Sequence, residues 1–247
     1  MPPSDVEFDS GADRVRGYLA SPDLPGPHPG LIVVPDVHGL GDHYRDVARR
    51  FAREGFATLA VDIYSREGAP TLADPGAVGR WIRALPDERV LGDLEAALTY
   101  LAAIPHVAGA PVAITGFCMG GQYALLAACR DARLAACVPW YGMLRYQGYD
   151  DCNPASPLDR AAALHCPLLG LYGENDSLIP LADVEELRRR LAGAGKDFEI
   201  HTYRGAGHAF FNDTRPAAHR RDAAQHAWRR AIAFLHARLD PKSAATD

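Results

Sequence analysis

The chain has 247 residues, of which 48% are hydrophobic and 23% charged, and its formal net charge is −5. This acidic balance argues against a nucleic-acid-binding surface, and no apolar stretch is long enough to span a membrane. We expect a single domain over 1–247, with flexible tails at 1–4 and 241–247. The five cysteines are odd in number and lack a Cys-x-x-Cys spacing, so we expect neither a disulfide framework nor a zinc site. We expect a cytoplasmic location, because a reducing compartment keeps thiols free.

Strands and helices alternate along the predicted chain. The apolar run 31–34 is typical of a strand buried on both faces. In chain order the predicted elements are a hairpin of strands 5–9 and 14–20, a strand at 31–34, a helix at 43–54, a strand at 56–61, helices at 75–85 and 88–103, a strand at 112–115, a helix at 119–130, strands at 134–138 and 167–172, a helix at 181–192, a strand at 198–203 and a helix at 217–238.

This alternation predicts an α/β fold with a mainly parallel central sheet of about 7–8 strands and helices on both faces. In such sheets, ligands bind beyond the carboxyl ends of the strands. The side chains singled out below follow predicted strands at that edge.

The run Gly116-Phe-Cys-Met-Gly-Gly121 lies between the predicted strand 112–115 and helix 119–130. Strand, sharp turn and helix form the nucleophile elbow of α/β-hydrolases, and the flanking glycines allow the chain to reverse closely around Cys118. The positive end of the helix dipole favours a thiolate there. The sequence therefore predicts an α/β-hydrolase fold with Cys118 as the nucleophile.

A base and an acid follow in the order that α/β-hydrolases use. Asp176 comes after the predicted strand 167–172, and His208 comes after strand 198–203. Glu174 is a competing candidate for the acid, although the turn followed by proline favours Asp176. We expect the backbone N–H groups of Met119 and Val37 to form the oxyanion hole, because fixed donors need no reorganisation.

Six motifs are spread along the chain: Pro35-Asp-Val-His-Gly39, Asp62-Ile-Tyr64, Gly92-Asp-Leu94, Gly116-Phe-Cys-Met-Gly-Gly121, Gly173-Glu-Asn-Asp176 and Gly205-Ala-Gly-His-Ala-Phe210. At these motifs the sequence resembles the dienelactone hydrolase, or carboxymethylenebutenolidase, family over nearly its whole length. The resemblance implies hydrolysis of esters or lactones by a Cys-His-Asp triad, here Cys118, His208 and Asp176, without a metal or organic cofactor.

Two positions depart from the enzymes that open dienelactones. Those enzymes carry a glutamate that modulates the thiol, where this chain has Asp36. We expect Asp36 to take that role, with an Asx-turn residue as the alternative. The same enzymes also hold the substrate carboxylate with arginines, and Asn212 stands where one of these is expected. An uncharged ester is therefore as acceptable a substrate as a dienelactone. Aromatic residues that could line the pocket, or equally belong to the core, are Tyr64, Trp81, Trp140, Tyr141 and Phe210.

The sequence thus favours a cysteine-dependent hydrolase of a small carboxylic ester or lactone, acting as a monomer or small homo-oligomer. His38, Asp42 and His43 match no metal-ligand spacing, so no metal is expected. Two alternatives stay open. One is a general small-ester esterase that does not use dienelactone, and the other is a non-catalytic protein of this fold that binds a ligand or senses oxidants through Cys118.

Overall fold

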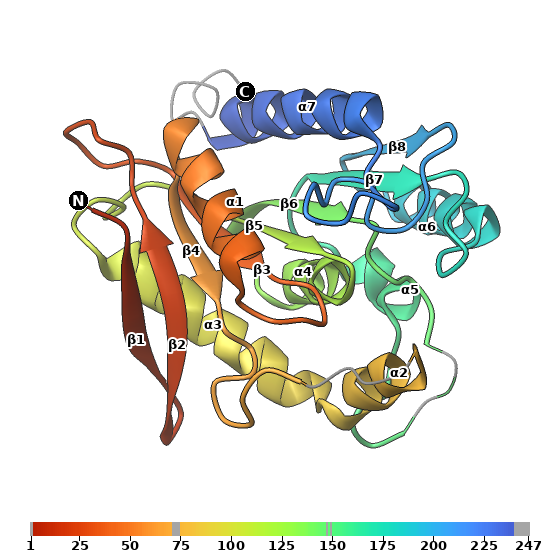
Figure 1. The fold of residues 1–247 in the computed structure, drawn as a ribbon, viewed down its shortest axis with the longest axis horizontal. Coiled ribbons are helices and arrows are strands. Elements are labelled where there is room, and N and C mark those ends of the chain that lie inside the picture. Colours follow the sequence, from red (N-terminus) through yellow and green to blue (C-terminus); the bar gives the residue numbers. More distant parts are fainter. Residues whose placement is uncertain (1, 71–74, 147, 149, 240–247) are drawn as a thin grey trace.

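A computed structural model describes residues 2–70, 75–146, 148 and 150–239, and Figure 1 shows its fold. The centre is an eight-stranded sheet in the order β1-β2-β4-β3-β5-β6-β7-β8. The strands β4-β3-β5-β6-β7-β8 pair in parallel, each with its neighbour in this order. β2 pairs antiparallel with both β1 and β4. The strand bounds are β1 Ser4–Ser10, β2 Asp13–Ala20, β3 Gly30–Val34, β4 Ala57–Val61, β5 Val112–Phe117, β6 Leu134–Trp140, β7 Leu168–Gly173 and β8 Phe198–Tyr203.

Helices cover both faces of this sheet (Figure 1). α1 and α7 share one face, where the ring of Phe51 packs on that of Trp228, and α3 and α4 pack together on the other. The helix bounds are α1 Asp42–Arg53, α2 Pro75–Ala84, α3 Asp87–Ala103, α4 Met119–Arg130, α5 Pro157–Arg160, the 3-10 turn η1 Ala161–Ala163, α6 Leu181–Gly193 and α7 Arg221–Leu239.

The central strands are buried on both faces, as their continuous apolar runs predict. Every residue of β3, β4, β5 and β7 is buried. The predicted fold class is therefore confirmed: this is an α/β-hydrolase architecture with eight strands.

The differences from the predicted elements lie in loops and at element ends. Residues 157–163 form α5 and η1, which the sequence pattern did not predict because one short turn of helix has no apolar periodicity. α7 begins at Arg221 rather than 217, because the chain around Pro216 makes a turn in which the Ala218 N–H donates to the Arg215 carbonyl.

At the chain ends, the tail expected at 1–4 overlaps β1, since Ser4 pairs with Leu19, and the expected tail at 241–247 lies outside the described residues. None of the described helices is both long enough and apolar enough to span a bilayer.

Candidate active site

Cys118 occupies the sharp turn between β5 and α4. Its backbone has φ 56° and ψ −119°, a conformation that costs energy for any residue other than glycine. The turn is fixed by the Cys118 N–H, which donates to the Trp140 carbonyl oxygen at 3.0 Å, and by the Cys118 carbonyl, which accepts the Gly121 N–H at 2.9 Å. The side chain stays 9% exposed, at the amino-terminal end of α4.

Glycine is required on both sides of this turn. A Cβ at Gly116 would overlap the Gly120 carbonyl, and one at Gly120 would overlap the carbonyl oxygens of Val34 and Pro35. The spacing that singled out Cys118 in the sequence therefore has a steric cause: the first turn of α4 lies directly against the ends of β3 and β5.

The structure brings His208 and Asp176 together from the loops after β8 and β7. Nδ1 of His208 lies 2.8 Å from Oδ2 of Asp176, whose side chain is fully buried. The other oxygen, Oδ1, accepts the N–H groups of Leu178 and Ile179 at 2.9 and 3.3 Å. The carboxylate is therefore held from both sides, whereas the competing Glu174 is exposed.

The second ring nitrogen of His208, Nε2, is buried and has no hydrogen-bond partner among the described residues. Burial lowers the pKa of His208, but the hydrogen bond with Asp176 and the neighbouring Cys118 thiol raise it, to about 10. The ring therefore lies beside Cys118, and its environment favours the imidazolium, which is the form that His208 reaches when Nε2 takes a proton from the thiol. A buried base with its far side fixed by a carboxylate can take a proton from an adjacent thiol.

Tyr64 joins the two segments expected to supply the oxyanion hole. Its hydroxyl donates to the Val37 carbonyl at 3.2 Å and lies 3.7 Å from the Met119 sulfur. Met119 is the first residue of α4, so its N–H has no acceptor within the helix. Val37 is in the loop after β3, which makes both N–H groups candidates for binding a developing oxyanion.

Asp36 is 4% exposed; it closes a turn and its charge acts on two buried tyrosines. Its Oδ1 accepts the His38 N–H at 2.9 Å, which is the Asx turn considered above. Burial, followed by the Asp36 charge, raises the pKa values of Tyr44 and Tyr141 well above the ordinary value, and the Cys118 thiol contributes to both. Asp36 and Cys118 thus share one cluster of buried tyrosines.

Arg215 is the cation of this cluster, and the sequence analysis missed it. Its Nη2 lies 3.8 Å from Oδ2 of Asp36, and its side chain is 39% exposed. The available signal was its place seven residues after His208, in the loop where Asn212 drew attention instead. Tyr44 was also missed as a site residue, because its spacing on α1 is that of a core-facing position.

The remaining pocket candidates divide into two groups. Trp140 and Phe210 are fully buried: the Trp140 indole donates to Thr115 Oγ1 at 3.1 Å, and the Phe210 ring packs against Tyr203. Asn212 is 3% exposed and its Oδ1 accepts the Thr214 N–H and hydroxyl, so it shapes the loop after His208. The contacts of these three side chains are packing and turn contacts, and their place in a substrate pocket stays a prediction.

Two aromatic candidates do border the site. The Tyr141 ring packs edge-on against His208, with 5.3 Å between centroids, and its φ of 39° is a second strained backbone position beside Cys118. Trp81 on α2 packs edge-on against Tyr64 at 6.0 Å. Tyr141 therefore contacts the expected base, and Trp81 contacts the residue that joins the two expected oxyanion donors.

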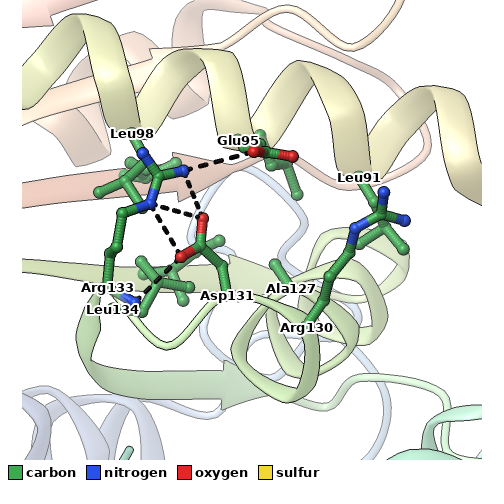
Figure 2. A pocket seen from close by; sticks show the side chains of 11 residues that line it. Leu91, Glu95, Leu98, Ala127, Arg130, Asp131, Arg133 and Leu134 are labelled. Carbon is green, nitrogen blue, oxygen red and sulfur yellow. Dashed lines mark hydrogen bonds and ion pairs between the residues drawn. The ribbon is translucent and has the colours of Figure 1, made fainter. Parts of the chain in front are cut away.

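Within the described residues, no three His, Cys, Asp or Glu side chains gather as a metal site would require, His38, Asp42 and His43 included. A separate cavity of about 250 Å³ lies between α3 and α4 (Figure 2). Its lining combines apolar side chains such as Leu91 and Leu98 with charged ones, among which Arg133 pairs with Asp131 at 2.6 Å. It contains none of the residues of the Cys118 cluster.

Known proteins are similar to this chain over nearly its whole length. The dienelactone hydrolase family model matches residues 15–239. A Bradyrhizobium protein named "Probable 2-oxo-3-(5-oxofuran-2-ylidene)propanoate lactonase" is 38% identical over 230 residues, covering 93% of this chain and 92% of its own. The Escherichia coli K12 "Putative carboxymethylenebutenolidase" is 39% identical over 233 residues, covering 92% of this chain and 83% of its own.

Among solved structures, a crystal structure titled as a putative dienelactone hydrolase from Klebsiella pneumoniae superposes with a TM-score of 0.88 at 34% identity, covering 95% of this chain and 99% of its own. The family model, the relatives and the fold therefore agree along nearly the full length. The chain belongs to the dienelactone hydrolase family, whose members are hydrolases of carboxylic esters and lactones.

Proposed function

We propose that the protein hydrolyses small lactones or esters through a thioester on Cys118, with His208 as the base and Asp176 as the group that orients it. The observation that carries this proposal is the 2.8 Å contact between His208 Nδ1 and Asp176 Oδ2. It leaves the buried Nε2 beside the thiol, in the arrangement that nucleophilic catalysis by cysteine needs.

The reaction proceeds in two halves. Nε2 of His208 takes the thiol proton, and Sγ of Cys118 attacks the acyl carbon, whose oxygen becomes an oxyanion bound by the N–H groups of Met119 and Val37. The C–O bond then breaks, the leaving oxygen receives the proton from His208, and a thioester remains. Water, deprotonated by His208, attacks the thioester and releases the carboxylic acid together with the thiol. No metal or organic cofactor takes part in these steps.

The substrate class follows from Arg215 and Asp36. Arg215 is more than a third exposed and keeps only a 3.8 Å approach to Asp36, so its guanidinium retains donors for an incoming carboxylate. We therefore propose a lactone or activated ester that carries its own carboxylate. The name of the Bradyrhizobium relative, a propanoate lactonase, describes a substrate of this kind.

The nucleophile is tested with Cys118→Ala and a p-nitrophenyl ester. Cys129→Ala is the matched control, because Cys129 is also a buried thiol of α4 but lies near the opposite end of the helix. We expect Cys118→Ala to lose turnover and the acyl adduct seen by mass spectrometry of the quenched parent, while Cys129→Ala keeps both. Turnover by Cys118→Ala would refute the proposal. A parent without turnover on any ester or lactone would favour a binding or redox-sensing protein.

The substrate class is tested with Arg215→Met, assayed on a carboxylate-bearing enol lactone and on a neutral aryl ester. Loss of one charge-assisted hydrogen bond predicts a rise in KM of about tenfold or more for the charged substrate and little change for the neutral one. The exposed Arg53, in the last turn of α1, provides the control variant Arg53→Met. Equal effects on both substrates would contradict a carboxylate-binding role and favour a general small-ester esterase.

A further inference from the structure

A second buried carboxylate lies outside the proposed triad. Asp87 is the first residue of α3 and is 4% exposed. Both of its oxygens accept the Tyr146 hydroxyl at 3.0 Å, and Oδ1 also accepts the Asn153 side-chain N–H at 3.0 Å. The mechanism above does not use this group. Burying a carboxylate costs free energy, which the hydrogen bonds from these donors offset.

The Asp87 cluster reaches the helix that carries the nucleophile. The Tyr146 hydroxyl accepts the side-chain N–H of Gln122 at 3.0 Å, and Gln122 is fully buried on α4. The backbone N–H of Gln122 in turn donates to the Cys118 carbonyl at 3.1 Å. A continuous series of hydrogen bonds therefore connects Asp87 with the turn that presents the thiol.

The same cluster fixes the end of α2. The Asn153 side-chain N–H also donates to the carbonyl of Leu85, just after α2, and the Asp87 N–H donates to the Cys152 carbonyl at 2.8 Å. α2 carries Trp81, which packs on Tyr64. In Figure 1, α2 and α5 lie beside the edge of the sheet where the parallel strands end. Asp87 thus joins the end of α2 with Tyr146 and Asn153, which come from separate parts of the sequence.

This arrangement requires an acceptor at position 87, because the Tyr146 hydroxyl and the Asn153 side-chain N–H both donate to it. Oδ1 accepts from both donors, so a side chain without an oxygen at this position would leave both of them without this acceptor. Leaving buried donors unpaired costs more than the hydrogen bond alone contributes.

We propose that Asp87 is a positioning residue, whose carboxylate holds the end of α2, Tyr146 and the segment 150–156 against α4 and so sets the width of the substrate pocket. The kinetic part of this proposal rests on the hydrolase function proposed above. Loss of the Asp87 carboxylate affects how tightly substrate is bound and leaves the proton transfer between His208 and Cys118 in place.

The kinetic test compares Asp87→Ala and Tyr146→Phe with the parent on aryl esters of small and large acyl groups. We expect KM for the large ester to rise about tenfold in both variants, with kcat changed less than about threefold. Asp93→Ala is the control: Asp93 is another buried carboxylate of α3, but it pairs with Arg66 and Ser10. An unchanged KM, or a fall confined to kcat, would overturn the proposal.

A second measurement is independent of turnover. Hydrogen exchange is followed in the Cys118→Ala background with and without Asp87→Ala. Faster exchange of the peptide covering 150–156, with α7 unchanged, supports the positioning role, and identical exchange in the two proteins overturns it. If the parent hydrolyses no ester, the hydrolase proposal fails while the exchange measurement still decides the role of Asp87. Tyr146→Phe takes the place of Asp87→Ala in the exchange measurement if Asp87→Ala does not fold.

Discussion

Asp176→Asn is the substitution that examines the proposed mechanism most directly, because it changes one atom and keeps the shape of the side chain. In the parent, Oδ1 accepts two backbone N–H groups and Oδ2 contacts Nδ1 of His208. The amide of asparagine would keep its oxygen toward the backbone donors and turn its N–H toward Nδ1. The ring must then carry its proton on Nε2, where it can no longer accept one from Cys118.

The size of the effect follows from the electrostatics of the ring. The pKa of His208 is about 10 rather than the ordinary 6.5, which corresponds to about 5 kcal/mol of stabilisation of the imidazolium, shared between Asp176 and Cys118. Losing the Asp176 share and the correct tautomer together predicts a fall in kcat/KM of about 10 000-fold. We expect the pKa of His208, followed by NMR of the labelled imidazole, to fall in the same variant.

The assay is hydrolysis of an activated aryl ester by purified protein, with thermal unfolding to show that the variant is folded. Glu174→Gln is the matched control in the same loop: Glu174 is exposed, and we expect its variant to keep parental activity and an unchanged His208 pKa. If Asp176→Asn kept activity within tenfold of the parent, or if Glu174→Gln lost it, the assignment of Asp176 as the orienting acid would be wrong.

The remaining predictions concern stability. Because the folded-state pKa of His208 is raised, its contribution is complete below the unfolded value of 6.5 and is lost as pH rises toward 10. The free energy of unfolding should therefore fall over this interval, and less so in His208→Ala, as measured by urea denaturation. Gly120→Ala should destabilise the protein by more than about 3 kcal/mol, because its Cβ overlaps two carbonyl oxygens. Gly92→Ala, which meets no atom within 4 Å on α3, should stabilise it by up to about 1 kcal/mol in the same denaturation series; a loss there would contradict the steric reasoning.

The parts of the fold that could be predicted are those with a local cause. Both faces of β3 and β5 are covered, and their residues form short runs that are largely apolar. Such runs predict buried strands without reference to other segments. The glycines around Cys118 are equally local, since the turn and the first turn of α4 leave no room for a Cβ. The meeting of His208 with Asp176 could also be anticipated, because adjacent parallel strands end at one edge.

The parts that escaped prediction depend on contacts between distant segments. Asp87 is an ordinary first-turn acid in the sequence, and only folding brings it to Tyr146 and Asn153, 59 and 66 residues away. Trp140 and Phe210 show the opposite case: both follow the pattern of pocket aromatics at strand ends, yet both are fully buried. Whether an aromatic side chain at a strand end faces substrate or core depends on the layer packed against it, which local sequence does not encode.

Asp36 and Arg215 connect these two kinds of information. The sequence marked Asp36 as a departure from a glutamate, and its shorter side chain has a structural consequence: Oδ1 closes the turn at His38, while Oδ2 lies 3.8 Å from Arg215. At this separation the pair attracts without a hydrogen bond that would tie up the guanidinium. Under the substrate class proposed above, a carboxylate bound to Arg215 would compete with Asp36 for the same cation. Substrate charge would then be linked to the carboxylate that shares the tyrosine cluster with Cys118, and one arginine would serve both recognition and the electrostatics around the thiol.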